Sequence, residues 1–160
     1  MRATLIFPGI VPSGWGNFGK GGLSENFVPY GLAYISAYAK KEGHEIDLLD
    51  LRKLSGWGNF ESEVKKRSPG VFGISSMSIH FDVAQEAALR IKAIDKSSIV
   101  IVGGIHPTVA LEEVCKLRQF DHIITREGEI SFSRLLSEIE KGEPRERVIE
   151  GVPAEVGGMI

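Results

Sequence analysis

Four β-branched residues, Ile99–Val102, run without a polar break and are followed at once by Gly103 and Gly104. An unbroken apolar run of this kind is typical of a strand buried on both faces of a parallel sheet. Paired glycines after such a strand let a ligand approach the backbone, because no Cβ stands in the way. Pro107 stiffens the turn, and Thr108 is predicted to cap the following helix. We therefore expect a parallel sheet that binds a ligand at its carboxyl edge.

Further apolar runs alternate with helical patterns along the rest of the chain. We predict strands at 3–7, 45–51, 70–75, 98–102 and 122–125, and helices at 30–41, 60–67, 82–94, 109–117 and 129–141. This alternation predicts an α/β, flavodoxin-like (Rossmann-like) three-layer sandwich with a five-stranded parallel sheet in the order 2-1-3-4-5. The more polar run 45–51 is expected near an edge of the sheet, and residues 147–150 are compatible with an additional short edge strand. In this order the ligand crevice lies between strands one and three.

Composition narrows the partners that such a domain is expected to have. The chain has 160 residues and a net charge of −2, which gives no electrostatic reason to expect nucleic acid or a membrane as a partner. Cys115 is the single cysteine, so an intramolecular disulfide and a cysteine-only metal or iron–sulfur site are excluded within this chain. No apolar run approaches ~18 residues and the N-terminus lacks a signal-peptide pattern, so we expect a cytoplasmic protein. Residues 1–150 are predicted to form one domain, and 151–160 to be a linker or the point where a longer chain was cut.

The glycine-rich segment after the first strand contains two phosphate-binding patterns. Gly14, Gly16 and Gly19 match G-x-G-x-x-G, and residues 14–20 match G-x-x-x-x-G-K. Both patterns need a tight turn directly between a strand and a helix, whereas here they begin seven residues after Phe7 and no helix follows directly. The match is poor, and a flavin- or nucleotide-binding flavodoxin-like protein that uses this loop is kept only as an alternative function.

The hexapeptide SGWGNF occurs twice, at 13–18 and at 55–60. Both copies are expected at the carboxyl edge of the sheet, where a tryptophan beside glycines could cover a flat ligand or a partner surface. Coincidence between two glycine-rich loops accounts for the repeat equally well, and no mechanism that we know requires two copies.

Small polar residues follow the third predicted strand, where the ligand crevice is expected. This cluster consists of Ser75, Ser76, Met77, Ser78 and His80. Small hydroxyl side chains can hydrogen-bond a polar ligand without filling the space around it. The alternative is that they cap the helix predicted to begin at Asp82, but their position at the switch point favours ligand binding.

The four histidines are scattered along the chain. His44 opens the second strand and is expected to be exposed, whereas His122 is expected to be a structural histidine with a satisfied hydrogen bond. His80 and His106 lie in loops at the ligand edge and are better candidates for ligand contact. No H-x-x-x-H, H-E-x-x-H or Cys/His cluster is present, which argues against a zinc or iron site built by this chain.

Several sequence blocks, in their order and spacing, resemble one known family. They are PYGLAYISAY at 29–38, GHE at 43–45, GIS at 73–75, GGIHPT at 103–108 and REGE at 126–129. Together they are similar to the cobalamin-binding domain found N-terminal to radical SAM enzymes. That group includes methyltransferases and the anaerobic magnesium-protoporphyrin monomethyl ester cyclase. The resemblance covers roughly residues 1–150.

The resemblance implies a flavodoxin-like domain that holds cobalamin at the carboxyl edge, with the nucleotide tail running down between strands one and three. Its implied site lies on the three loops that follow strands three, four and five. The cofactor-binding residues expected from pattern and resemblance are Ser75, Ser76, Met77, Ser78, His80, Gly103, Gly104, His106, Pro107, Thr108, Glu127, Gly128 and Glu129.

Two departures from related patterns limit what this chain is expected to do. Cobalamin domains of the methionine synthase type carry D-x-H-x-x-G after strand one, but the corresponding loop here has no histidine. By resemblance we therefore expect base-off cobalamin without a protein histidine ligand. The C-x-x-x-C-x-x-C that binds the SAM-cleaving iron–sulfur cluster is also absent, so cluster and SAM are expected only in a domain outside this chain.

The function expected from these observations is a cobalamin-binding module that presents cobalt to a radical SAM catalytic domain, in cis or in trans. The chain alone is not expected to be catalytic, and its parent enzyme would be a radical SAM methyltransferase or cyclase. A signalling receiver is excluded, because Pro8-Gly9 and serines stand where a receiver needs an acidic cluster and a phosphoacceptor aspartate.

Overall fold

The computed structural model describes residues 1–9, 28–143 and 146–152. The first glycine-rich patterns, the first SGWGNF copy and most of the predicted linker lie outside these residues. The strands are β1 (Arg2–Phe7), β2 (Glu45–Asp50), β3 (Val71–Ser75), β4 (Ile99–Gly103), β5 (His122–Thr125) and β6 (Val148–Glu150). The helices are α1 (Tyr30–Lys41), α2 (Trp57–Lys65), α3 (Phe81–Ile94), α4 (Ile105–Val109), α5 (Leu111–Cys115) and α6 (Glu129–Glu140), with short 3₁₀ turns η1 (Leu51–Lys53) and η2 (Ser78–His80).

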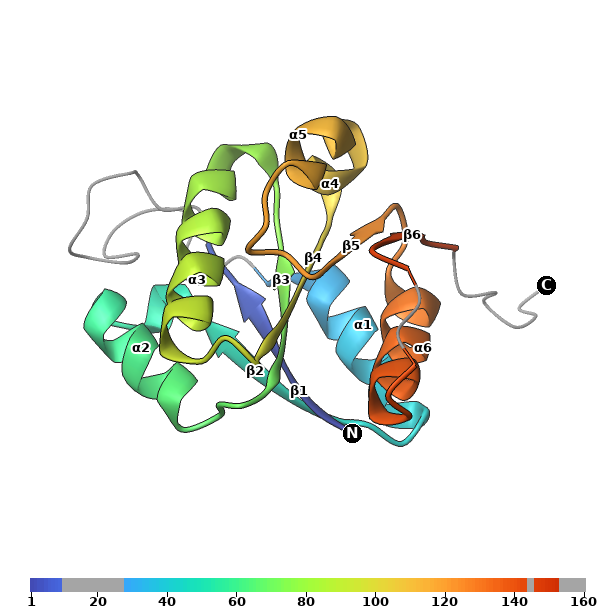
Figure 1. Cartoon of the computed structure of the whole chain (residues 1–160), viewed down its shortest axis with the longest axis horizontal. Helices are drawn as coiled ribbons and strands as arrows, with labels where there is room; N and C mark the ends of the chain where they lie inside the picture. Colours follow the sequence, from blue (N-terminus) through green and yellow to red (C-terminus); the bar gives the residue numbers. More distant parts are fainter. Residues whose placement is uncertain (10–27, 144–145, 153–160) are drawn as a thin grey trace.

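The strands form one parallel sheet in the order β2-β1-β3-β4-β5-β6. The predicted order of the first five strands is confirmed, and the polar strand β2 lies at an edge as expected. The five-strand prediction is one strand short, because Val148–Glu150 pairs in parallel with β5. All carboxyl ends therefore point to one edge of the sheet, at the top of Figure 1.

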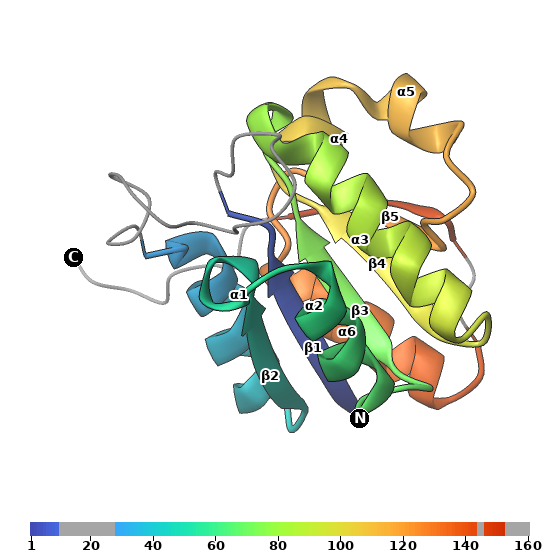
Figure 2. The same cartoon turned by 90° about the vertical axis from the view of Figure 1, so that its left-hand side faces the viewer.

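Helices cover both faces of the sheet and complete the three layers. Figure 2 shows α2 and α3 in front of the sheet and α1 and α6 behind it. The α2/α3 face buries aromatic and aliphatic side chains such as Phe60, Phe72 and Ile91. On the other face, α6 contributes Leu135 and Leu136, which are almost completely buried. Burial of each such side chain contributes roughly 1.5–3 kcal/mol, which anchors the helices that surround the site.

The region after β4 differs from the sequence prediction. The sequence pattern predicts a single helix at 109–117, but the structure has two short helices, α4 and α5, separated at Ala110. Thr108 lies inside α4 and does not cap a helix, so that prediction is wrong. Its Oγ1 donates to the Gly104 carbonyl at 2.9 Å and accepts from the Arg126 N–H at 2.7 Å. Thr108 thereby connects the loops after β4 and β5.

His44 is buried, so the prediction that it is exposed is wrong. Its Nε2 lies 3.1 Å from the Ser133 carbonyl and its Nδ1 lies 3.4 Å from the N-terminal ammonium of Met1. These bonds connect the start of β2 to α6 and β1. The prediction for His122 is confirmed, because its Nδ1 lies 2.7 Å from the Glu146 carbonyl in a buried position.

Candidate functional site

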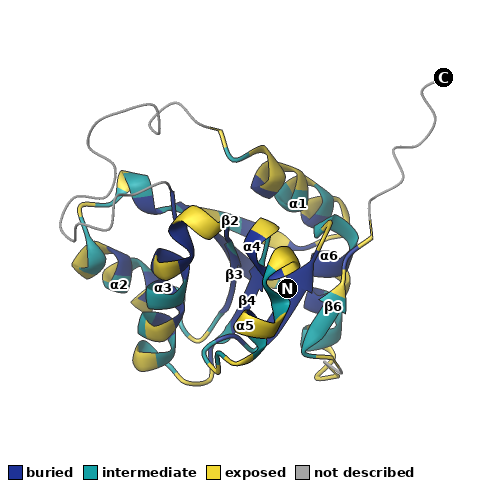
Figure 3. Ribbon diagram, turned by 90° about the horizontal axis from the view of Figure 1, so that it is seen from above, coloured by how far each residue is buried: buried dark blue, intermediate teal, exposed yellow. Residues whose placement is uncertain are grey.

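A cavity of about 420 Å³ opens at the carboxyl edge, between the sheet and helices α1 and α6. Strands β1, β3, β4 and β5 form one wall, and the loops that follow β3, β4 and β5 form the rim. Figure 3 looks down on this edge, with the buried strands between the two helical layers. The cavity therefore lies where a doubly wound sheet binds its ligand.

The floor of the cavity is apolar. Leu5, Gly73 and Ile101 form one row across β1, β3 and β4, because Leu5 pairs with Gly73 and Gly73 with Ile101. This row lies two residues, or about 7 Å, below the edge residue Ser75. Phe132 from α6 faces the row, and a Cβ at Gly73 would come within 2.9 Å of both Leu5 Cδ2 and Phe132 Cε2. Glycine at 73 thus allows Leu5 and Phe132 to pack directly over the strand backbone at the base of the cavity.

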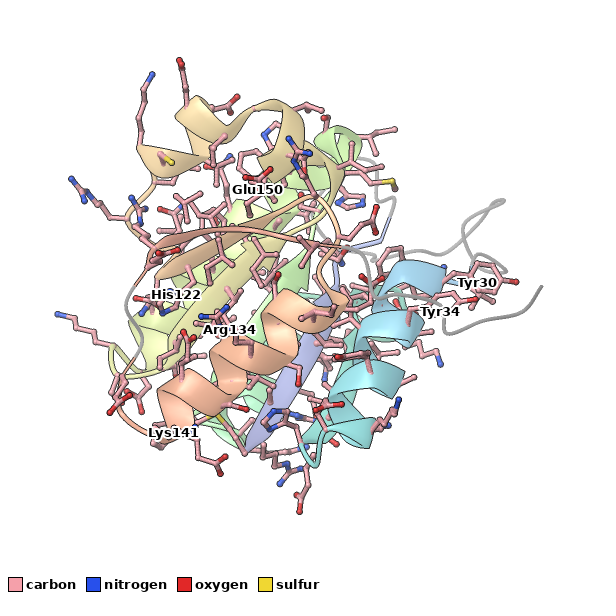
Figure 4. The ribbon with its side chains drawn as sticks, turned by 90° about the vertical axis from the view of Figure 1, so that its right-hand side faces the viewer. Tyr30, Tyr34, His122, Arg134, Lys141 and Glu150 are labelled. Atoms are coloured by element: carbon pink, nitrogen blue, oxygen red, sulfur yellow. The ribbon has the colours of Figure 1, made fainter. Side chains whose placement is uncertain are left out.

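Helix α1 supplies the opposite wall. Leu32 and Ile35 line the cavity, whereas Tyr30 and Tyr34 are exposed. Figure 4 shows both tyrosines projecting outward from the first turns of α1. The helix therefore turns its aliphatic side chains toward the cavity and its aromatic side chains toward the outside of the domain.

The loops after β3 and β4 are hydrogen-bonded to each other at the rim. The Ser76 N–H donates to the Gly103 carbonyl at 2.8 Å, and the His106 N–H donates to the Ser76 carbonyl at 3.1 Å. Gly104 has φ +104°, and a Cβ there would lie 2.7 Å from the Ser76 carbonyl oxygen. Glycine is therefore required at 104, both by its positive φ and by the close approach of the two loops.

The turn after β5 completes the rim. Arg126 has φ 57°, and a Cβ at Gly128 would lie 3.2 Å from Ile35 Cδ1, so the turn lies tightly against α1. Glu129 Oε2 is buried and has no hydrogen-bond partner among the described residues. Gly151 lies beneath the turn, where its N–H donates to the Thr125 carbonyl at 2.9 Å and a Cβ would come within 1.8 Å of the Glu127 carbonyl oxygen.

His80 is the most unusual polar residue of the cavity wall. It is only 1% exposed, and neither ring nitrogen has a hydrogen-bond partner among the described residues. Its ring lies edge-on to Phe7, with 6.0 Å between the centroids. Burial lowers the pKa of His80 below its ordinary value, although Asp82 and the backbone act in the opposite direction. His80 is therefore a neutral side chain with one donor and one acceptor at its ring nitrogens.

The structure brings most, but not all, of the predicted site residues to the cavity. Those that line it are Ser75, Met77, His80, Gly103, Gly104, Thr108, Glu127, Gly128 and Glu129. Those that do not line it are Ser76, Ser78, His106 and Pro107. His106 instead forms a hydrogen bond between its Nδ1 and Ser78 Oγ, which are 3.0 Å apart. Its ring stacks on Phe81, with 3.8 Å between the ring centroids. The serines do not cap α3 either, since that helix has no side-chain cap.

Sequence reasoning missed the apolar lining and one cation. The missed lining residues are Leu5, Phe7, Pro29, Gly31, Leu32, Ile35, Gly73, Ile74, Ile101, Ile105, Ile124, Arg126 and Phe132. The alternating spacing of Leu5 and Phe7, and of Ile101 and Gly103, marks one face of each strand. In a sequence, however, that signal is the same for a cavity wall as for a filled core.

The remaining sequence features contribute little to this site. The second SGWGNF copy forms the start of α2, where the Trp57 ring packs edge-on against Phe60 and carries the Arg90 guanidinium 4.8 Å from its centroid. Residues 1–9, 28–143 and 146–152 contain no group of three His, Cys, Asp or Glu side chains placed to hold a metal ion. In the same residues, no helix is both long and apolar enough to span a membrane.

A parallel, doubly wound sheet whose carboxyl edge carries a cavity with an apolar floor and a polar rim defines an α/β ligand-binding domain. The B12 binding domain family matches residues 23–136, which is more than half of the chain, and the chain belongs to that family. The resemblance to a cobalamin-binding domain is thus confirmed, and family membership supports cobalamin as the ligand.

Known relatives are longer than this chain. The uncharacterized methyltransferase PH0819 of Pyrococcus horikoshii is 28% identical over 118 residues, which cover 71% of this chain and 25% of that protein. The radical SAM methyltransferase TsrM of Kitasatospora setae superimposes with a TM-score of 0.70 at 19% identity, covering 89% of this chain and 26% of that one. The cobalamin-dependent radical SAM enzyme OxsB, with aqua-cobalamin bound, superimposes with a TM-score of 0.61 at 19% identity. The match covers 90% of this chain and 19% of OxsB. The two structures establish the shared fold, and this chain spans about a quarter or less of each relative.

The cavity fits a corrinoid by its own chemistry. Its apolar floor can take a flat aromatic base, while its rim offers small residues and polar groups that a larger polar ring system could contact. The buried, unpartnered atoms of His80 and Glu129 lie in the cavity wall, whereas the unpartnered Nε2 of His106 lies outside it. Buried polar groups are nearly always satisfied in native proteins, so unpaired ones at a cavity indicate a polar ligand.

Proposed function

We propose that this chain is the cobalamin-binding module of a radical SAM enzyme and presents the corrin cobalt to a catalytic domain outside this chain. The observation that carries the proposal is the division of the cavity into an apolar floor and a polar, glycine-containing rim. Membership of the B12 binding domain family supports the ligand class.

In this proposal the nucleotide tail enters the cavity and the corrin lies across its rim. Leu5, Gly73, Ile101 and Phe132 would enclose the base of the tail, because they form the apolar floor. The lining residues of the three rim loops would contact the corrin and the upper part of the tail. The cavity is too small to enclose a whole cobalamin, which supports placing only the tail inside it.

The bound cofactor would be base-off, since its benzimidazole would occupy the floor rather than the cobalt. No protein histidine is proposed below the cobalt. Cobalamin supplies a cobalt centre that carries or accepts a methyl group or an electron. The residues of this chain bind and orient the ring and exclude water from the tail.

A radical SAM partner in cis or in trans would supply the iron–sulfur cluster, SAM and the substrate site. The names of the relatives support a radical SAM partner, as in TsrM and OxsB, and a methyltransferase as parent enzyme. A cyclase as parent enzyme rests on the sequence resemblance alone. Exposed apolar side chains at the rim, Ile79, Ile105 and Val109, give such a partner or the corrin an apolar surface to cover.

A visible absorption spectrum tests the proposal. The purified chain is incubated with hydroxocobalamin, desalted and scanned, with FMN as the parallel probe for a flavin-binding protein. We expect retained cobalamin with a base-off spectrum and no retained FMN. A retained base-on spectrum would contradict the tail placement, and retention of FMN alone would favour the flavodoxin-like alternative.

A further inference from the structure

His80 differs from every other histidine of this chain. His44 and His122 each bond a backbone carbonyl, and His106 pairs with Ser78 Oγ. His80 is the most buried of the four, yet both of its ring nitrogens lack partners among the described residues. Leaving a buried polar atom unpaired destabilises the folded state, so an imidazole with two unpaired nitrogens in a closed core would be selected against.

The position of His80 points to the ligand as its partner. It ends the short turn η2 after β3 and lines the cavity together with Ser75 and Met77. Phe7 contacts the ring edge-on, and the side chains of the floor, Leu5, Ile101 and Phe132, have no hydrogen-bonding atoms. A ligand seated at the rim would supply hydrogen-bonding atoms to this ring.

The chemistry of a neutral imidazole selects the kind of group that it can satisfy. One ring nitrogen donates and the other accepts. An ionised phosphate offers acceptors alone, whereas a primary carboxamide offers both an N–H donor and an oxygen acceptor. The periphery of a corrin carries several primary carboxamides, and these would lie at the rim if the ring lies across it.

We propose that His80 hydrogen-bonds the carboxamide groups of the bound corrin at the rim of the cavity. This inference rests on the proposed function, because it requires a corrinoid in the cavity. It assigns to His80 a contact with the ring rather than with the nucleotide tail or with cobalt.

The test compares variants of the full chain with two probes, hydroxocobalamin and cobinamide, which shares the corrin amides but lacks the nucleotide tail. His80→Phe keeps a planar ring and removes both nitrogens, while His80→Gln restores a donor and an acceptor. His122→Phe is the matched control, because His122 is also buried but lies at the amino end of β5, away from the cavity. Circular dichroism confirms that each variant is folded.

We expect His80→Phe to weaken the affinity for both probes at least tenfold and by similar factors. His80→Gln should stay within about threefold of the wild type, and the folded His122→Phe should bind like the wild type. In ¹⁵N spectra of the wild-type side chains, the ring nitrogens of His80 should shift on addition of hydroxocobalamin while those of His122 do not. This measurement holds even if His80→Phe fails to fold.

Three results would overturn the inference while leaving cobalamin binding intact. They are wild-type affinity in His80→Phe, a loss confined to hydroxocobalamin, and an axial nitrogen splitting in the cobalt(II) EPR spectrum that disappears in His80→Phe. The second would assign His80 to the tail and the third to the metal. If the wild-type chain binds neither probe, the proposed function itself fails.

Discussion

At the scale of single residues, glycines and one histidine define the rim of the cavity. Gly104 allows the loops after β3 and β4 to touch through their backbones. Gly128 lets the turn after β5 approach α1. His80, at the end of η2, contributes a neutral polar ring beside Leu5 and Phe7, the apolar wall residues of β1. Each of these positions can be tested by a single substitution.

Gly104→Ala is expected to destabilise the domain by roughly 1–3 kcal/mol, because alanine would be strained at φ +104° and its Cβ would meet the Ser76 carbonyl oxygen at 2.7 Å. Urea unfolding followed by circular dichroism measures the change. Gly58→Ala is the matched control, since Gly58 lies in α2 with nothing within 4 Å of its added Cβ. The control should lose no stability and gain up to about 1 kcal/mol from helix propensity. Equal unfolding free energies for the two variants would contradict the account of the rim.

The stability of the apo domain is expected to fall as the pH drops below the ordinary histidine pKa of 6.5. The pKa of His80 is lowered in the folded state, chiefly by burial, so the unfolded chain binds this proton first and the contribution is fully present only above that pH. Asp82 opposes the effect but does not reverse it. Urea unfolding between pH 5 and pH 8 measures the slope. The slope should decrease in His80→Phe, and an unchanged slope would show that other groups cause it.

At the scale of helices and strands, the sequence is sufficient for the regular elements and insufficient where tertiary contacts decide. Apolar runs and helical periodicity predict five strands and four of the five expected helices, because each buries an apolar face, whereas the helix expected at 109–117 is two short helices. The pattern leaves the strand Val148–Glu150 open, since three residues carry no clear alternation and its pairing depends on β5. Burial of His44 depends on α6, distant in sequence.

The candidate site shows the same division. Most of the rim residues could be predicted, because glycines and small polar residues at the ends of buried parallel strands add little to a packed core. The cavity floor could not be predicted, because Leu5, Ile101 and Phe132 have the pattern of ordinary core residues. Their position in the floor depends on the pairing of Leu5 and Ile101 with Gly73. Loop position predicts Ser78 and His106 at the ligand, but it does not reveal that they pair with each other.

The apolar floor, formed by β1, β3, β4 and α6, is expected to discriminate between corrinoids by their lower base. If the tail occupies the cavity as proposed, benzimidazole meets aliphatic and aromatic side chains alone, whereas adenine would lose the hydrogen bonds of its amino group. One such unsatisfied group costs about 1–3 kcal/mol, so the adenine-containing analogue should bind roughly 5- to 150-fold more weakly than cobalamin. Absorption titrations of the full chain measure both affinities. Equal affinities would place the base outside the cavity.

At the scale of the whole molecule, both faces of the sheet bury a hydrophobic cluster, and the candidate site lies on one of them. The α2/α3 face is a continuous core, whereas the α1/α6 face contains the cavity between its helices and the strand ends. A ligand that fills this space binds the folded chain and not the unfolded one. Ligand binding and folding are therefore thermodynamically linked.

Cobalamin is expected to raise the free energy of unfolding by about 2.7 kcal/mol when its free concentration is 100 times its Kd. Chemical denaturation with and without hydroxocobalamin, at several ligand concentrations, measures this shift. Cyanide-free buffer keeps the cobalt ligands constant between samples. A midpoint that does not move with cobalamin concentration would contradict binding to the folded state.

The location of Gly151 beneath the turn after β5 has a mechanical consequence. There is no room for a Cβ between this residue and the Glu127 carbonyl, so the chain directly after β6 packs against the turn. The backbone bond from Gly151 to Thr125 joins the two segments. A displacement of the chain at β6 would therefore be transmitted to the rim of the cavity, and a displacement of the rim would be transmitted to β6.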